Sequence, residues 1–130
     1  MISRNSFIIA IVTVFCLCCS RDNFTPTVID CDEQFTYENQ IKPIIDSSCS
    51  YSGCHDAGSG IGPLNYTIYE GMLPHLTNGS FRDRVILQKD DIIKGMPPDT
   101  VTWPQSIKTE LSDEELDMIA CWLEVGFPKN

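Results

Sequence analysis

Two cysteines and one histidine form the most informative group of reactive side chains in this chain. They stand in Cys49-Ser-Tyr-Ser-Gly-Cys54-His55, so the imidazole directly follows the second thiol. Two such thiols can form thioethers to a haem, and the adjacent imidazole can bind the haem iron. The commoner spacing is C-x-x-C-H, and the longer C-x4-C-H loop needs backbone freedom, which Gly53 supplies. The motif therefore predicts one covalent c-type haem, haem c.

Other chemistries remain open for the same cysteines. Cys49 and Cys54 could form a small-loop disulfide, in which case no haem is attached. A zinc site would need two further ligands, and Cys31, Cys121 and His75 stand at no familiar zinc spacing from the motif. No Ser-His-Asp arrangement with supporting motifs indicates a hydrolase. Haem attachment is the favoured interpretation, and the disulfide is the main alternative.

A second pair of cysteines, Cys31 and Cys121, brackets the expected domain. Because the termini of a compact domain are often neighbours, a disulfide between them is favoured over two buried thiols. This disulfide would close nearly the whole domain into one loop. On the chain-entropy model, it would add about 4 kcal/mol of stability.

The N-terminal residues predict export. One positive charge, at Arg4, precedes an apolar run, which is typical of a signal peptide. Cys19 follows this run in a pattern similar to a bacterial lipobox, so we expect residues 1–18 to be removed and Cys19 to be lipidated. An ordinary cleaved signal and an uncleaved anchor are the alternatives. Residues 19–30 would form a tether, and residues 31–130 a domain at the periplasmic side or outer surface of a bacterial membrane, where disulfides can form.

Composition limits the class of protein further. The chain has 130 residues, 42% of them hydrophobic and 21% charged, which is typical of one small globular domain. The formal net charge of −9 makes an acidic surface that repels phosphate backbones, so nucleic acid is not an expected partner. No apolar stretch in the domain is long enough to predict a multi-span membrane fold.

Helices must position the reactive residues. Apolar spacing predicts a first helix over 35–49, with Thr36 as N-cap and with a kink or split at Pro43. The cysteine motif follows at the C-terminal end of this helix. Two shorter helical segments are expected at about 66–73 and 81–87.

The last helix has the clearest signals. It begins at Ser112, which forms a capping box with Glu115, and Gly126 is its expected C-cap. Trp122 is expected in the core, where the first and last helices cross. No alternating strand pattern is present. The sequence therefore predicts an all-α fold with three to five short helices and long loops.

Together these features resemble a small class I-type cytochrome c domain, of the kind found in exported lipoproteins of Bacteroidetes-like bacteria. The resemblance covers about residues 35–127, and the C-x4-C-H spacer departs from the family pattern. Five pieces in the family's order carry it: Ile41-Lys-Pro-Ile-Ile, Cys54-His55, Gly62-Pro63-Leu64, Gly95-Met96-Pro97-Pro98, and Leu111-Ser with Trp122-Leu-Glu-Val-Gly126.

The resemblance implies a role for each matching residue. Cys49 and Cys54 would bind the haem, His55 would be the proximal iron ligand, and the carbonyl of Pro63 would accept a hydrogen bond from its second nitrogen. Met96 would be the distal iron ligand. The cytochrome c-like fold would surround one haem with an apolar shell made of Ile41, Ile45, Leu64, Leu73 and Met96.

Other residues are weaker candidates for the haem site. His75 could replace Met96 as distal ligand, although a lone histidine is by default a surface or core residue. Met72 is a second alternative, but Met72 and Met118 have the helical spacing of core residues. Trp103 stands in a loop and could pack on the haem.

The function implied by the resemblance is electron transfer, not catalysis, because both axial positions of the iron would be occupied. Redox proteins with a basic or neutral docking face are the expected partners, and a lipid anchor would hold the carrier at a membrane. The sequence leaves the oligomeric state open. Two alternatives remain: a haem-free surface lipoprotein binding module with a Cys49–Cys54 disulfide, and a haem enzyme or sensor in which Met96 is displaceable.

Overall fold

The computed structural model of the chain describes residue 31, residues 34–58 and residues 62–130. Every regular element in these ranges is helical, which confirms the expected all-α class for this part of the chain. The expected signal peptide and tether, residues 1–30 with Cys19, lie outside the described residues. Within the described ranges, no helix combines the length and apolar character needed to cross a membrane.

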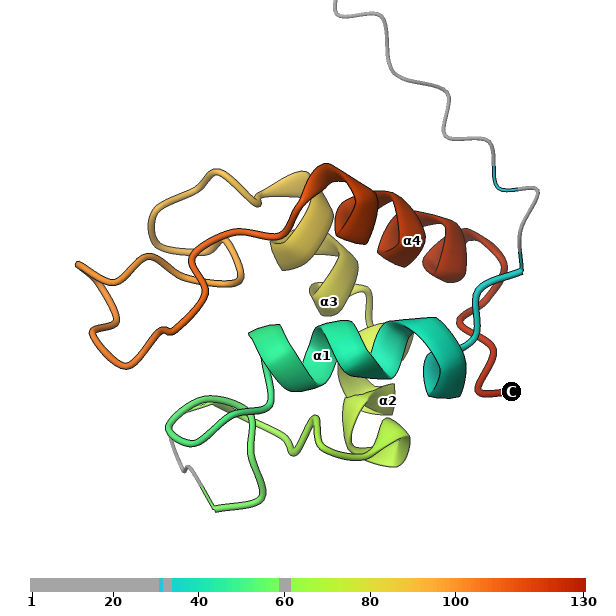
Figure 1. Ribbon diagram of the computed structural model, residues 1–130, viewed down its shortest axis with the longest axis horizontal. Helices are drawn as coiled ribbons and strands as arrows, with labels where there is room; N and C mark the ends of the chain where they lie inside the picture. Colours follow the sequence, from blue (N-terminus) through green and yellow to red (C-terminus); the bar gives the residue numbers. More distant parts are fainter. Residues whose placement is uncertain (1–30, 32–33, 59–61) are drawn as a thin grey trace, which may run out of the picture.

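A continuous helical segment leads to the cysteine motif (Figure 1). It begins as the π-helix η1, Tyr37–Ile41, and continues as α1, Lys42–Ser48. Pro43 lies in the first turn of α1, where its missing N–H removes no hydrogen bond of that helix. Instead of the kink or split that was expected at Pro43, the segment changes from π to α geometry at Lys42, directly before this proline. Thr36 stands at the expected N-cap position, but its side chain makes no capping hydrogen bond.

The second helix, α2, spans Tyr69–Thr77 and begins later than the helix expected at 66–73. The side-chain oxygen of Asn65 accepts hydrogen bonds from the backbone N–H and the hydroxyl of Thr67. This local turn competes with helix formation and delays the start of α2.

The third helical region corresponds to the segment expected at 81–87. It consists of α3, Ser80–Arg82, which continues directly into the π-helix η2, Asp83–Leu87. A long connection without helices, residues 88–112, follows it and reaches the last helix. In Figure 1 this connection forms the orange loops that project at the left end of the molecule.

The last helix, α4, spans Asp113–Glu124 and begins with the expected capping box. The Glu115 N–H donates to Ser112 Oγ at 3.2 Å, and the Ser112 N–H donates to the Glu115 carboxylate at 2.8 Å. The C-cap position is held by Val125 instead of Gly126. Gly126 is the next residue and takes the left-handed φ of +86° that ends the helix.

The core lies where α4 crosses η1, as the sequence predicted for Trp122. The Trp122 side chain is fully buried, with the rings of Tyr37 and Phe81 at centroid distances of 6.3 and 6.4 Å. Its Nε1–H donates to the Pro128 carbonyl at 2.9 Å. The core is therefore built from both ends of the described chain together with the middle helices.

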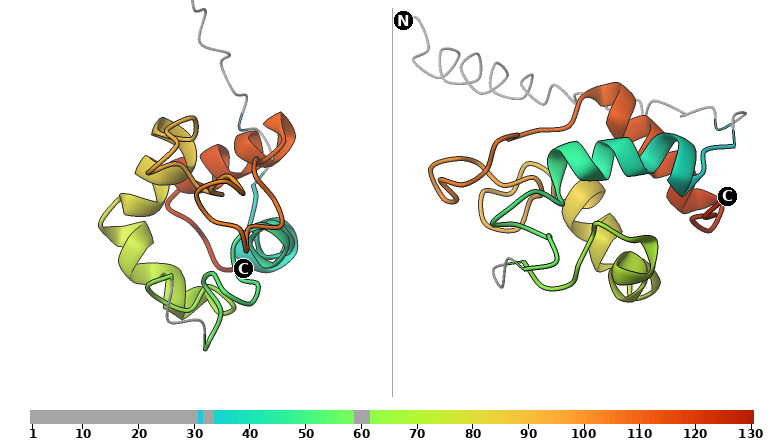
Figure 2. Two further views of the ribbon diagram at one scale, coloured as in Figure 1. Left: turned by 90° about the vertical axis from the view of Figure 1, so that its left-hand side faces the viewer. Right: turned by 60° about the horizontal axis from the view of Figure 1, so that its bottom comes forward.

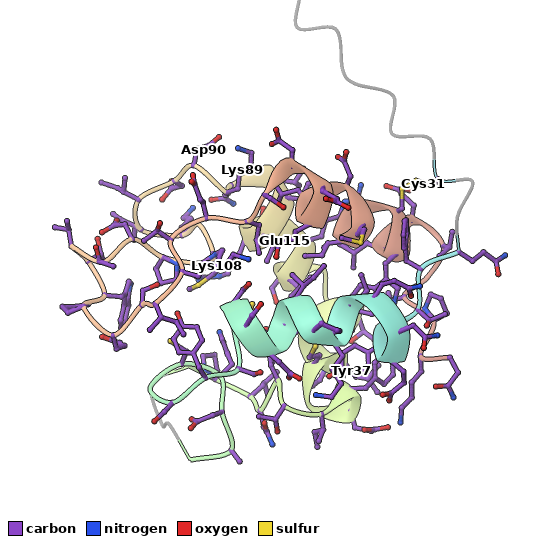
Figure 3. The ribbon with its side chains drawn as sticks, viewed as in Figure 1. Cys31, Tyr37, Lys89, Asp90, Lys108 and Glu115 are labelled. Atoms are coloured by element: carbon purple, nitrogen blue, oxygen red, sulfur yellow. A yellow bond between two sulfur atoms is a disulfide. The ribbon has the colours of Figure 1, made fainter. Side chains whose placement is uncertain are left out.

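A disulfide joins Cys31 to Cys121, with a Cα–Cα distance of 5.3 Å. This is the pairing that the sequence favoured. The same end of the molecule is held by backbone hydrogen bonds, because the Tyr37 N–H donates to Pro128 and the Glu38 N–H donates to the Lys129 carbonyl. Figure 3 labels Cys31 and Tyr37 in this region.

Candidate functional site

The cysteine motif forms a closed loop at the C-terminal end of α1 (Figure 1). The His55 N–H donates to the Cys49 carbonyl and the Cys54 N–H donates to the Tyr51 carbonyl, both at 3.0 Å. Gly53 has a φ of +89°, so the loop uses the backbone freedom that was expected of this residue. Both cysteines are present as thiols, with Cys49 buried and Cys54 half-buried.

The His55 imidazole is held by the backbone of the segment that follows it. Its Nδ1 lies 2.9 Å from the Pro63 carbonyl oxygen. Because a carbonyl can only accept, Nδ1 carries the donated proton, and Nε2 keeps the lone pair that can bind a metal. Burial lowers the pKa of His55, and the hydrogen bond to Pro63 opposes this effect only in part. The imidazole is therefore biased toward its neutral form, which is the form that binds metals.

Gly62 allows this close approach between the two segments. Its N–H donates to the Cys54 carbonyl at 3.1 Å. A Cβ atom at position 62 would lie 2.7 Å from that carbonyl oxygen and 2.8 Å from His55 Nδ1. No side chain fits there, so the Gly62-Pro63 pair is required by the contact with the motif.

One cavity of about 480 Å³ lies against the motif. This volume is in the usual range of small-molecule and cofactor sites. Its walls come from the motif loop, the segment after Gly62, the α2–η2 region and the connection that follows η2. It is lined by all the residues that the sequence assigned to the cofactor, namely Cys49, Cys54, His55, Pro63 and Met96.

The surroundings of Cys49 favour the thiol over the thiolate. Burial raises its pKa to about 12, and the neighbouring Cys54 adds to the increase. Within the described ranges, no group of three or more His, Cys, Asp or Glu side chains is arranged to hold a metal ion. That finding does not concern a site with one histidine and one methionine ligand.

Met96 is fixed on the cavity wall by its backbone. Its N–H donates to the Arg84 carbonyl at 3.2 Å. The preceding Gly95 is buried, and a Cβ atom there would lie 2.4 Å from the Lys89 carbonyl oxygen. Close packing therefore requires glycine at position 95, and the next residue, Met96, lies at the cavity.

The prediction of which residues form the apolar shell is mostly wrong. Ile41 and Ile45 are fully buried in the core instead of lining the cavity, because they lie on the core side of the first helical segment. Leu73 packs against the same core, and Leu64 is 38% exposed. Of the expected shell, only Met96 lines the cavity, whose apolar wall is completed by Phe81, Val85, Pro97, Pro98 and Trp103.

Sequence analysis missed Tyr66, which stacks flat on His55. Their ring centroids lie 4.1 Å apart and their planes differ by 7°. The Tyr66 hydroxyl lies 2.5 Å from Nδ1 of His75, and both residues line the cavity. His75 is therefore a cavity residue, whereas Met72 is fully buried in the core as expected. Nothing in the spacing of Tyr66 distinguishes it from a core aromatic residue.

His75 is the second imidazole on the cavity wall, and its environment also favours the neutral form. Burial lowers its pKa, and the positive charge of Arg84 adds to the effect. Trp103 lines the same cavity from the connection after η2.

No family model, no curated protein and no solved structure matches the chain.

Proposed function

We propose that the chain is an electron carrier that holds one covalent c-type haem in this cavity. The observation that carries the proposal is the hydrogen bond from His55 Nδ1 to the Pro63 carbonyl, on the wall of a cavity that Cys49, Cys54 and Met96 also line. An oriented imidazole, two thiols and a thioether on one cavity are the donor set that a c-type haem needs.

Each residue has a distinct role in this proposal. Cys49 and Cys54 would provide the thioether links, while His55 Nε2 and the Met96 sulfur would hold the iron. When bound, such a haem supplies a reversible one-electron couple. The Pro63 carbonyl keeps His55 in one tautomer and orientation. The apolar wall of the cavity would keep water away from a bound haem, which favours electron transfer over substrate chemistry.

The finer fold proposal is a cytochrome c-like arrangement. It is supported by the order of the elements: a first helical segment that ends at the motif, and a last helix that crosses it at Trp122. The cavity lies between the motif loop and the segment that carries Met96.

The proposed partners are redox proteins with a neutral or basic docking face. Acidic residues predominate in the whole chain, but the connection beside Met96 carries exposed apolar side chains at Ile92, Ile93, Val101 and Ile107. A neutral face is therefore the better match for a partner that approaches the cavity. Lipidation at Cys19, which would hold the carrier at a bacterial membrane, remains part of the proposal.

Mass spectrometry and optical spectroscopy test the proposal directly. The exported chain is produced in cells that express cytochrome c maturation proteins, and the purified protein is examined for a covalent haem adduct. We expect one haem and a low-spin spectrum in both oxidation states. The Cys54→Ala variant should keep one thioether and shift the pyridine haemochrome spectrum accordingly. A Cys121→Ala variant, altered far from the cavity, should leave that spectrum unchanged.

The possible outcomes separate the alternatives. A colourless protein with a Cys49–Cys54 disulfide would overturn the proposal and favour a haem-free binding module. A haem protein that is high-spin, or that readily binds added ligands when reduced, would instead indicate an enzyme or sensor with a displaceable Met96.

A further inference from the structure

We propose that Tyr66 is a positioning residue that clamps the His55 imidazole, and that His75 holds Tyr66 in place. This inference depends on the proposed function only in naming His55 as an iron ligand. The clamp itself is a feature of the protein, and three neighbouring contacts define it: the flat stack of Tyr66 on His55, the hydrogen bond to His75, and the hydrogen bond from the Tyr66 N–H to the His55 carbonyl at 2.8 Å.

The stack supplies a restraint that the Pro63 hydrogen bond lacks. A single hydrogen bond at Nδ1 fixes the distance to one carbonyl but allows the imidazole to pivot about the line that joins the two atoms. A ring lying parallel at 4.1 Å prevents that rotation, because turning the imidazole would drive its edge into the Tyr66 face. Pro63 and Tyr66 together therefore fix the plane of the imidazole.

Tyr66 is itself firmly held. It is 5% exposed, and the ring of Phe81 lies edge-on to it with a centroid distance of 6.2 Å. Its hydroxyl is bonded to His75, which lies in the last turn of α2. The clamp therefore connects the motif loop to α2.

The hydrogen bonds assign opposite tautomers to the two histidines. The Tyr66 hydroxyl must donate its proton to an acceptor when buried, and His75 Nδ1 is the acceptor within reach. His75 therefore carries its own proton on Nε2, whereas His55 carries its proton on Nδ1 and keeps a lone pair on Nε2. Of the two imidazoles on the cavity wall, only His55 is prepared to bind iron, and His75 serves the clamp.

Paramagnetic NMR of the oxidised holoprotein tests the clamp, because the spread of the haem methyl shifts reports the orientation of the axial imidazole plane. Tyr66→Leu removes the stack and should change the order or spread of these shifts. Tyr66→Phe and His75→Leu keep the stack, remove the hydroxyl contact, and should cause smaller changes of the same kind. Tyr69→Phe is the matched control, because its hydroxyl donates to the Phe127 carbonyl away from the cavity.

A measurement on the haem-free protein separates this inference from the proposed function. The Tyr66 ring current should shift the His55 side-chain protons upfield, and Tyr66→Leu should abolish that shift whether or not haem is ever attached. Should Tyr66→Leu fail to fold, Tyr66→Phe and His75→Leu carry the test alone. Wild-type shifts in all folded variants would overturn the inference. Loss of the low-spin spectrum in His75→Leu would also overturn it, because His75 would then be an iron ligand.

Discussion

At the scale of single residues, the position of one proton separates the two histidines of this protein. His55 donates through Nδ1 to a backbone carbonyl, whereas in the proposed clamp His75 accepts at Nδ1 from the Tyr66 hydroxyl. Both side chains line the same cavity, so proximity alone would treat them as equivalent. The partner at Nδ1 decides which imidazole offers a lone pair at Nε2.

The first prediction concerns Gly62. A Cβ atom at this position would lie 2.8 Å from His55 Nδ1 and 2.7 Å from the Cys54 carbonyl. Gly62→Ala should therefore lower the free energy of unfolding by about 1–3 kcal/mol and weaken the His55–Pro63 contact. Gly58→Ala is the control, because nothing lies within 4 Å of its Cβ position. Equal unfolding free energies for the two variants in urea titrations would contradict the close approach.

The second prediction concerns the proposed distal ligand. Met96→Ala should remove the weak long-wavelength sulfur-to-iron band of the oxidised protein and lower the reduction potential, because a thioether ligand raises it. Met118→Ala should leave both unchanged, since Met118 packs against the core and does not line the cavity. Optical spectra and potentiometric titration provide the measurement. A band that survives in Met96→Ala would show that another residue binds the iron.

At the scale of elements, helix ends can be compared by their side-chain hydrogen bonds. Ser112 and Glu115 satisfy each other's backbone N–H groups at the start of α4, whereas Thr36 occupies an N-cap position without such a bond. Ser112→Ala should therefore lower the free energy of unfolding by about 1 kcal/mol. Thr36→Ala should lower the free energy of unfolding by clearly less. Chemical denaturation of both variants checks the difference, and equal losses would argue against the capping box as the cause.

Acid should weaken the same end of α4. Burial alone would raise the pKa of Glu115, but the Lys108 ammonium and the Ser112 hydrogen bonds outweigh burial and hold this pKa below its usual value. The pKa of Glu115 is thus lower in the folded state than in the unfolded state, where it is near 4.3. The resulting stability is present above about pH 4.3 and is lost as the pH falls through the folded pKa.

Glu115→Gln should flatten this part of the stability profile. The neutral amide keeps a similar shape but loses the ion pair with Lys108, whose Nζ lies 2.6 Å from the carboxylate. Glu114→Gln, an exposed neighbour on the same helix, is the control. Unfolding free energies measured from pH 6 down to about pH 3 should converge for wild type and Glu115→Gln at the acid end. If the unfolding free energies of wild type and Glu115→Gln differ by the same amount at every pH, the ionisation of Glu115 does not contribute to the pH dependence.

The elements also show how far sequence reasoning reaches. The α4 helix could be predicted because its signals are local: the capping residues and the apolar stripe lie within one segment. The start of α2 could not, because the Asn65 turn that delays it depends on one side-chain choice. The His55–Pro63 contact followed from a family pattern, but Tyr66 and His75 are joined to His55 only through tertiary packing. Ile41 and Ile45 were misplaced because an apolar helical face does not reveal whether it meets a cofactor or another helix.

At the scale of the whole molecule, the Cys31–Cys121 disulfide closes nearly the entire described chain into one loop. Replacing the pair with Cys31→Ser and Cys121→Ala should lower the free energy of unfolding by about 4 kcal/mol. The optical spectrum of the proposed haem protein should not change, because neither residue lines the cavity. Reductant should destabilise the wild-type protein and leave the double variant unaffected in guanidinium titrations. An equal loss of stability in the wild type and the double variant would show that the reductant does not act through this disulfide.

The position of that disulfide has a directional consequence. Figures 1 and 2 place the end of the molecule near residue 31 opposite the loops around residues 49–58 and 97–105, which contribute to the cavity. If the chain is fastened to a bilayer through the residues before Cys31, as proposed, its cavity lies at the end of the domain farthest from the point of attachment. In the proposed carrier, that end is the one a diffusing protein or a projecting domain could reach.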